Sequence, residues 1–346
     1  IQPRVLLGPG PSMVSPRVLN ALSYPLVGHL DPQFITVMDE VQELLRYVFQ
    51  TQNRLTLPIS GTGSAGMEAA ICNFVEPGDP VLVCVCGYFG SRIVEMAGRY
   101  GAAVDVLSKP WGEAFDPEEI KVALQKCAYK MVAIVHGETS TGVCQPLEDL
   151  AEIVHANGAL LLVDTVASLG GTDIAVDSLG LDIVYSGSQK CLSCPPGMAP
   201  ITISPEAYNR LKQRKTKVAN WYLDLTMLEN YWGESRIYHH TAPINMVYAM
   251  RESLRLVYEE GLDNQVKRHL MHAQLLWDGL QGLGLDLVVA ENFRLPTLTT
   301  VYVPEGVDEA ALRKQLLLDF NIEIAGGLGA FKGKAWRIGL MGCSSK

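Results

Sequence analysis

The sequence predicts an α/β fold with a mostly parallel, seven-stranded sheet in a large domain and a smaller C-terminal α+β domain. Its length of 346 residues suggests two domains. From residue 55, short apolar runs rich in β-branched residues alternate with helical patterns, as in a parallel sheet covered on both faces. After about residue 259 this rhythm gives way to long helical patterns and isolated strand candidates. We therefore expect a large domain at residues 1–259 and a small domain at 260–346.

Each element follows from the local sequence. The first thirty residues are rich in Gly and Pro and predict an irregular segment, of which residues 1–16 form an N-terminal arm. Asp31 and Pro32 predict the cap and first turn of a helix that runs to about Gln50. The seven strand candidates are Leu55–Ile59, Val81–Val85, Ala103–Leu107, Met131–Val135, Leu160–Val163, Ile183–Tyr185 and Ile201–Ile203. Between them we expect the helices Ser64–Val75, Ser91–Tyr100, Pro117–Cys127 and Leu147–Ala156.

The later elements have a different character. The expected helices are Ile244–Glu260, Asp263–Leu283 and Asp308–Phe320, and the expected strands are Leu298–Val303 and Ala335–Ile338. No internal repeat accompanies them.

Composition and charge narrow the function classes. A net charge of −9 argues against binding a nucleic-acid backbone, and no apolar run is long enough to predict a membrane span. Eight scattered cysteines, mostly in apolar surroundings, indicate free thiols in a reducing compartment, and we expect a cytoplasmic protein. Cys191 and Cys194 form a C-x-x-C pair. No second pair stands at zinc spacing, so we expect no metal.

A glycine-rich segment follows the first strand candidate. Residues 61–66 fit G-x-G-x-x-G, but no acidic residue ends the next strand, so the ribose anchor of a dinucleotide site is missing. Backbone N–H groups at a helix N-terminus still suit a single phosphate. The alternative interpretation is a tight turn without a ligand.

An acid and a lysine lie at or just past the carboxyl ends of two neighbouring strand candidates. Asp164 closes an apolar strand, and Lys190 lies among small, uncharged residues just past the following strand. Parallel strands bring such positions to one edge of the sheet, where ligands bind. A turn-capping Asp and a surface Lys are the alternatives. Together with the glycine-rich segment, however, the pair provides what pyridoxal 5'-phosphate (PLP) requires: an amine for its aldehyde, a carboxylate for its ring nitrogen and a phosphate site.

Short motifs are spread over nearly the whole chain. They are Gly8-Pro9-Gly10-Pro11, Ser60-Gly61-Thr62-Gly63, His136-Gly137-Glu138-Thr139, Val163-Asp164-Thr165-Val166, Ser186-Gly187-Ser188-Gln189-Lys190, Tyr238-His239-His240-Thr241 and Trp336-Arg337-Ile338-Gly339. Together they resemble the motifs of the class V, fold type I PLP-dependent aminotransferases, most closely the alanine–glyoxylate and serine–pyruvate group.

The resemblance implies a role for each matching residue. Lys190 would form the Schiff base with the cofactor, and Asp164 would pair with its ring nitrogen; these are the expected catalytic residues. Thr139 would bond the ring oxygen. The expected phosphate-binding residues are Thr62, Gly63, Ser64 and Gln189.

The resemblance also implies contacts with the cofactor ring, the partner subunit and the substrate. Phe89 would stack on the cofactor ring and Val166 would pack beneath it. Tyr238 and Thr241 would reach the phosphate of the partner subunit, so the resemblance implies a homodimer with shared sites. Arg337 would bind the substrate carboxylate; taken alone, it could equally form a salt bridge with a distant acid.

This sequence departs from the pattern at several points. Relatives often carry Trp at the position of Phe89 and His at that of Ser64, and they continue with a further helix beyond Lys346. The first two departures bear on the contacts around the cofactor, and the third bears on the stability of the small domain.

The expected activity is transamination from a small amino acid, alanine or serine, to a 2-oxo acid, with glyoxylate as the first acceptor and pyruvate as the second. No second basic residue stands out as a partner for a side-chain carboxylate, which favours a small neutral donor. The alternatives are another fold type I activity such as a lyase or desulfurase, a nicotinamide-dependent oxidoreductase, and a non-catalytic binding protein. A desulfurase would need a mobile cysteine, for which only Cys343 comes late enough in the chain.

Overall fold

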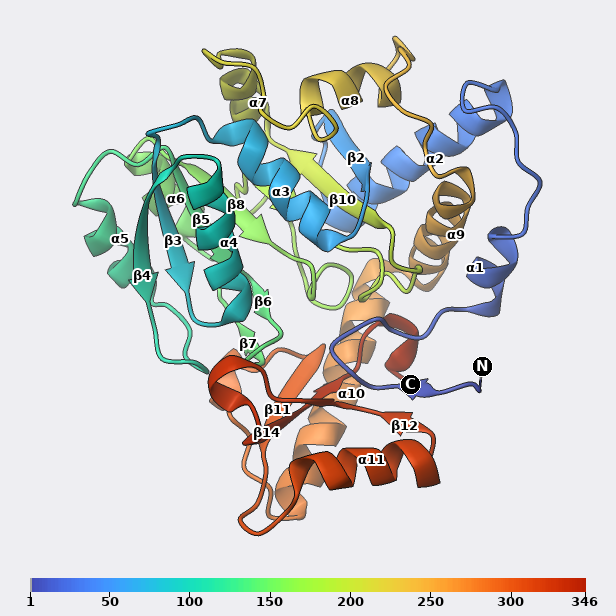
Figure 1. Ribbon diagram of the computed structural model, residues 1–346, viewed down its shortest axis with the longest axis vertical. Helices are drawn as coiled ribbons and strands as arrows, with labels where there is room; N and C mark the ends of the chain where they lie inside the picture. Colours follow the sequence, from blue (N-terminus) through green and yellow to red (C-terminus); the bar gives the residue numbers. More distant parts are fainter. Residues whose placement is uncertain (1) are drawn as a thin grey trace.

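A seven-stranded sheet forms the centre of the molecule in the computed structural model, which describes residues 2–346 (Figure 1). The strand order is β2-β10-β9-β8-β5-β3-β4. All neighbours are parallel except β10, which is antiparallel to both β2 and β9. The strands are β2 (Leu55–Ser60), β3 (Pro80–Val85), β4 (Ala103–Ser108), β5 (Met131–Val135), β8 (Leu160–Asp164), β9 (Ile183–Tyr185) and β10 (Met198–Ile203). The predicted mostly parallel, seven-stranded sheet is therefore confirmed.

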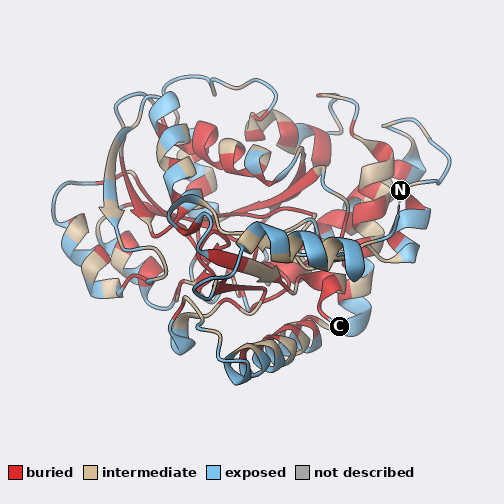
Figure 2. Ribbon diagram, turned by 60° about the horizontal axis from the view of Figure 1, so that its bottom comes forward, coloured by how far each residue is buried: buried red, intermediate tan, exposed pale blue. Residues whose placement is uncertain are grey.

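Helices pack on the sheet and bury it. In Figure 1, α3 and α4 lie in front of the sheet, and Figure 2 shows the central strands buried beneath helices whose outer sides are exposed. The helices of this part are α2 (Pro32–Phe49), α3 (Gly63–Phe74), α4 (Tyr88–Arg99), α5 (Pro117–Leu124), α6 (Leu150–Ala156), α7 (Pro205–Lys212), α8 (Leu225–Trp232) and α9 (Ile244–Glu260). Central strands such as β5 and β8 are buried along their whole length, which explains their continuous apolar sequences.

Local capping fixes where several helices begin. Asp31 accepts a hydrogen bond from the backbone N of Gln33, and Pro32 occupies the first turn of α2. Asp116 and Glu119 form a capping box at the start of α5. These are the signals from which the sequence predicts helix starts.

The first thirty residues contain more regular structure than the sequence predicts. Helix α1 (Pro16–Ala21) begins at Ser15, whose side chain accepts from the backbone N of Arg17. Its Val18 and Ala21 are buried. Strand β1 (Val5–Leu6) pairs in parallel with β12 (Ile322–Glu323). The expectation of a wholly irregular segment was wrong, because a capped turn can form among prolines when Pro stands at its N-terminus.

The C-terminal elements lie below the sheet in the view of Figure 1. A three-stranded antiparallel sheet, of order β11-β14-β13, lies beside two helices. The elements are α10 (Leu262–Gly282), β11 (Leu298–Tyr302), α11 (Glu309–Asp319), β13 (Ala325–Gly326) and β14 (Ala335–Gly339). Within residues 2–346, no helix combines the length and the apolar character that crossing a bilayer requires.

Candidate active site

A cavity of about 210 Å³ lies at the carboxyl ends of β8 and β9. All predicted site residues line it except Tyr238, Thr241 and Arg337. The lining consists of Thr62, Gly63, Ser64, Met67, Phe89, Arg92, Val135, Gly137, Thr139, Asp164, Val166, Ala167, Gln189 and Lys190. A larger, open hollow of about 820 Å³ between α2 and α10 contains none of the predicted residues. The smaller cavity is therefore the candidate active site.

The glycine-rich loop brings the start of α3 to one side of this cavity. Thr62, the N-cap residue, makes no side-chain capping bond, so N–H groups of the first turn remain available to a ligand. A Cβ at Gly63 would come within 3.2 Å of Val166, on the opposite wall. Any larger residue here would require Val166 to shift by a few tenths of an ångström, so glycine suits this close approach of the two walls.

Asp164 is buried on the floor of the cavity, with 2% of its surface exposed. Its Oδ1 accepts from the backbone N of Val166 at 2.8 Å and its Oδ2 from the hydroxyl of Tyr185 at 2.7 Å. Burial raises its pKa to about 6, although these two hydrogen bonds oppose the change. Among residues 2–346, no cationic side chain forms an ion pair with it. A cationic ligand group would fit here.

Lys190 faces the same cavity from the loop after β9. Its amine donates to the carbonyl of Pro9, and Ser12 holds the loop by donating its hydroxyl to the Lys190 carbonyl at 2.7 Å. Burial lowers the pKa of the amine to about 8. A Cβ at Gly10, which has a φ of +103°, would come within 2.7 Å of the Lys190 side chain. The N-terminal arm thus covers the lysine closely and requires glycine there.

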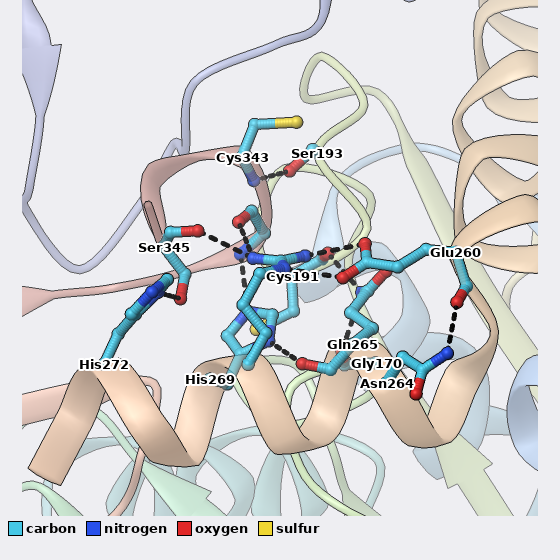
Figure 3. Close-up of polar contacts among 12 residues, drawn as sticks. Gly170, Cys191, Ser193, Glu260, Asn264, Gln265, His269, His272, Cys343 and Ser345 are labelled. Carbon is cyan, nitrogen blue, oxygen red and sulfur yellow. Dashed lines mark hydrogen bonds and ion pairs between the residues drawn. The ribbon is translucent and has the colours of Figure 1, made fainter.

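The backbone that follows Lys190 is held by distant parts of the chain (Figure 3). Gln265 on α10 donates from Nε2 to the carbonyls of Gly170 at 2.7 Å and Cys191 at 3.3 Å. The backbone N of Cys343 donates to the Ser193 hydroxyl at 2.7 Å. Side-chain and backbone bonds from the C-terminal region therefore fix the loop that carries the lysine.

The C-x-x-C pair lies in this loop as two buried, free thiols. Burial raises the pKa of Cys191 to about 12 and that of Cys194 above its usual range. Both cysteines are therefore protonated near neutral pH, which does not suit a redox-active thiolate. Within residues 2–346, no three His, Cys, Asp or Glu side chains gather as a metal site requires.

Glu138, which the sequence prediction missed as a functional residue, caps α4 from a different part of the chain. It is fully buried at the end of β6 (Gly137–Glu138). Its Oε2 accepts from the backbone N of Phe89 at 3.0 Å and of Gly90 at 3.2 Å. Its Oε1 accepts from the backbone N of Ser140 at 3.0 Å and from the Ser140 hydroxyl at 2.6 Å. Four donated bonds favour an ionised carboxylate, although burial raises the pKa of Glu138.

This cap positions two of the predicted cofactor contacts. Phe89 lies in the first turn of α4, where Gly87 is the N-cap residue and has no side chain of its own to contribute. A Cβ at Gly87 would fall on the Glu138 side chain. Thr139 follows Glu138 directly and is also buried. Glu138 therefore couples the position of the Phe89 ring to that of Thr139.

Arg337 lies on β14, half-buried and close to the cavity without lining it. Its Nε donates to the carbonyl of Gly326 at 2.8 Å and its Nη1 to the carbonyl of Thr139 at 3.1 Å. In the described part of the chain Arg337 forms no salt bridge, so no acidic partner supports the alternative interpretation as an ordinary ion pair. The guanidinium remains free to bind an anion.

Tyr238 and Thr241 are exposed and do not line the cavity of their own chain. Tyr238 is 56% exposed and its ring contacts that of His29, with centroids 4.9 Å apart. Its neighbour Ile237 is also exposed, and exposed Trp221 and Tyr222 pack near the ring of His239. The structure thus separates these two predicted residues from the other ten.

Two further residues belong to the site. Tyr185, which bonds Asp164, is also its register partner across β8 and β9, so strand pairing could have identified it. Arg92 lines the cavity from α4. A single arginine on an amphipathic helix carries no signal of this kind in sequence.

The chain belongs to the class V aminotransferases. The family profile described as Aminotransferase class-V matches residues 5–333. The fold and the acid–lysine cavity are consistent with this family, which makes the protein a transferase and an enzyme; the oxidoreductase and binding-protein alternatives are thereby set aside.

Several relatives align with this sequence over nearly its whole length. A solved structure of alanine–glyoxylate aminotransferase from Nostoc sp. is 56% identical, with a TM-score of 0.99, and the match covers 100% of this chain and 92% of that one. The alanine–glyoxylate aminotransferase of Felis catus is 46% identical, over 99% of this chain and 84% of the relative. The (S)-ureidoglycine–glyoxylate transaminase of Bacillus subtilis is 43% identical, over 99% of this chain and 87% of the relative. Fold type I is thus confirmed together with the family.

Proposed function

We propose that this enzyme uses PLP to move an amino group from a small amino acid, alanine or serine, to glyoxylate, with pyruvate as a second acceptor. The observation that carries the proposal is the placement of Asp164 and Lys190 on one cavity, beside a free guanidinium. The names of the relatives support glyoxylate as the acceptor, since both kinds use it.

The residues present fit PLP. Asp164 is a buried carboxylate without a cation, as a pyridinium partner should be. The uncapped start of α3 suits a phosphate. Gln189 Oε1 is buried without a hydrogen-bond partner in the described residues, and the NH₂ of the same amide is the group that could donate to a phosphate oxygen. We assign the phosphate to Thr62, Gly63, Ser64 and Gln189, the ring oxygen to Thr139, and the ring faces to Phe89 and Val166.

Catalysis then depends on how two side chains handle protons. When bound, PLP supplies a protonated ring that withdraws electrons from the substrate Cα–H bond. Asp164 keeps the ring nitrogen protonated, because an adjacent carboxylate favours the cationic form. The Lys190 amine, with its pKa lowered to about 8, can take the Cα proton and return it as general base and acid.

Arg337 binds and orients the substrate. Every amino acid and 2-oxo acid substrate carries a carboxylate, which a planar guanidinium binds through two parallel hydrogen bonds. Because its Nε and Nη1 already bond backbone carbonyls, the guanidinium is held in place before substrate arrives.

We further propose a homodimer with shared sites, in which Tyr238 and Thr241 bind the phosphate of the partner subunit. Their exposure outside their own cavity supports this, as does the group of exposed aromatic residues near them. A cytoplasmic location is our proposal from the cysteines, all eight of which are free. A desulfurase finds less support, because Cys343 lies in a 3₁₀ turn with its backbone bonded to Ser193.

Absorbance spectra and a donor panel test the function. PLP bound to the enzyme should colour it yellow, and borohydride reduction followed by peptide mapping should label Lys190. Alanine and serine should be used with glyoxylate faster than aspartate or glutamate. Label on another lysine, or turnover confined to elimination of sulfur or water, would overturn the proposal.

A further inference from the structure

Arg92 is a cavity-lining cation without an acidic partner. Its Nη1 donates to the Ser64 hydroxyl at 3.2 Å. Its Cζ lies 4.9 Å from the ring centroid of Phe89 and 5.2 Å from that of Tyr88. Within residues 2–346, Arg92 forms no salt bridge. All its contacts are therefore neutral, and its charge is available to a ligand.

The charges of the cavity and of PLP can be matched one by one. The charged side chains in the lining are Asp164, Lys190 and Arg92. Under the proposed function, Asp164 pairs with the ring nitrogen and Lys190 reacts with the aldehyde. A phosphate monoester carries about 1.5 to 2 negative charges at pH 7. It is the most highly charged group of PLP and has no ionic partner so far, and Arg92 is the charged side chain left without a role.

The position of Arg92 agrees with this matching. Ser64, its hydrogen-bond partner, lies in the first turn of α3, where the uncapped N–H groups are. The partial charge of a helix N-terminus, about half an elementary charge, does not balance a phosphate by itself. A guanidinium has five N–H donors, so a contact with Ser64 leaves others free. The aromatic rings of Tyr88 and Phe89 limit where it can turn.

We infer that Arg92 binds the phosphate group of the cofactor as its ionic partner. The inference rests on the proposed use of PLP. The competing role for this arginine is to bind the side-chain carboxylate of a dicarboxylic amino donor. Its contact with Ser64 at the phosphate loop favours the phosphate, since Arg337 on β14 is the guanidinium placed for substrate.

Comparing PLP with pyridoxal, which lacks the phosphate, isolates this interaction. Apoenzyme is prepared from the wild type, Arg92→Gln, Arg92→Lys and the control Arg99→Gln. Arg99 lies on the same helix but pairs only with the exposed Glu95, at 2.8 Å. Dissociation constants for both ligands are measured by absorbance and fluorescence titration. Thermal unfolding of each apoenzyme with added inorganic phosphate gives a second readout that needs no activity.

Arg92→Gln should weaken PLP roughly tenfold or more, because a charge-assisted hydrogen bond is lost. The affinity of the same variant for pyridoxal should change by less than about twofold. Arg92→Lys should lie between the wild type and Arg92→Gln, and Arg99→Gln should match the wild type. Phosphate should raise the melting temperature of the wild type and of the control more than that of Arg92→Gln.

Two results would overturn the inference. Equal weakening of PLP and pyridoxal would mean that Arg92 acts through the ring, by way of Phe89. Unchanged PLP affinity together with lost turnover of aspartate or glutamate would make it a substrate residue. If circular dichroism shows that Arg92→Gln misfolds, the test is made on Arg92→Lys instead, from the same ratio of the dissociation constants for PLP and pyridoxal. A wild type that binds PLP but transaminates nothing would refute the proposed function and leave this comparison intact.

Discussion

At the scale of single residues, the Lys190 amine shows how burial changes reactivity. Burial lowers its pKa from 10.5 to about 8, so the neutral, nucleophilic form accumulates above pH 8 in the folded protein. Between about pH 8 and 10.5 the unfolded chain binds more protons at this residue. The contribution of Lys190 to the stability of the apoenzyme should therefore rise with pH in that window.

The first prediction concerns the rate at which PLP attaches to the apoenzyme. The rate should rise with pH about a midpoint near 8, followed by stopped-flow absorbance. Lys190→Ala should show no covalent attachment after borohydride treatment while still binding PLP. A midpoint near 10.5 in the wild type would contradict the lowered pKa.

The second prediction concerns Arg337→Lys, which keeps the charge but removes the planar pair of donors. Loss of such a contact should cost roughly 2–5 kcal/mol of substrate interaction. The KM values for alanine and glyoxylate should rise at least about tenfold while PLP stays bound. Steady-state kinetics measure the first effect and the cofactor absorbance the second. If PLP were lost and KM stayed unchanged, Arg337 would be structural.

At the scale of elements, the sequence predicts those helices and strands that have a strong hydrophobic pattern. Strands β5 and β8 are short, continuous apolar runs with β-branched or leucine residues, and their prediction needs no tertiary information. The expected start of α4, at Ser91, was three residues late, because that helix begins at Tyr88 under a cap supplied by Glu138. Strands as short as β6 have no period to detect. Asp164 and Lys190 were predictable because Asp164 ends β8 and Lys190 lies in the loop just after β9, whereas the place of Arg92 in the site required the fold.

The third prediction tests the cap on α4. In Glu138→Gln, an NH₂ group replaces an oxygen that faces N–H donors, so at least one buried bond is lost. This should reduce the free energy of unfolding by about 1–3 kcal/mol. The visible circular dichroism of bound PLP should also change, because Phe89 shifts.

The control for this test is Glu152→Gln, on the exposed side of α6. It should leave both the melting temperature and the dichroism at wild-type values. A Glu138→Gln enzyme with an unchanged dichroism signal, even if less stable, would show that the cap does not position the ring.

At the scale of the whole molecule, shared sites can be tested by mixing two inactive variants. Lys190→Ala lacks the amine, and Tyr238→Ala lacks the contact proposed to come from the partner. In a mixed dimer, one site has both defects and the other has none. After joint refolding, about a quarter of wild-type activity should return, because half the dimers are mixed and each has one intact site.

Sedimentation of the same mixture checks that it is dimeric. No recovery of activity, or full activity in a monomer, would contradict shared sites.

The order of strands in the sheet has a consequence for synthesis on the ribosome. Strand β2 lies at the edge of the sheet and pairs only with β10, where Ser60 faces Met198. The loop at Thr62 is made early but has no neighbouring strand until β10 leaves the exit tunnel. The bonds from Gln265 and Cys343 that hold the lysine loop come later still. Under the proposed function, a nascent chain should therefore attach PLP at Lys190 only after the segment through Cys343 has emerged and packed against the lysine loop.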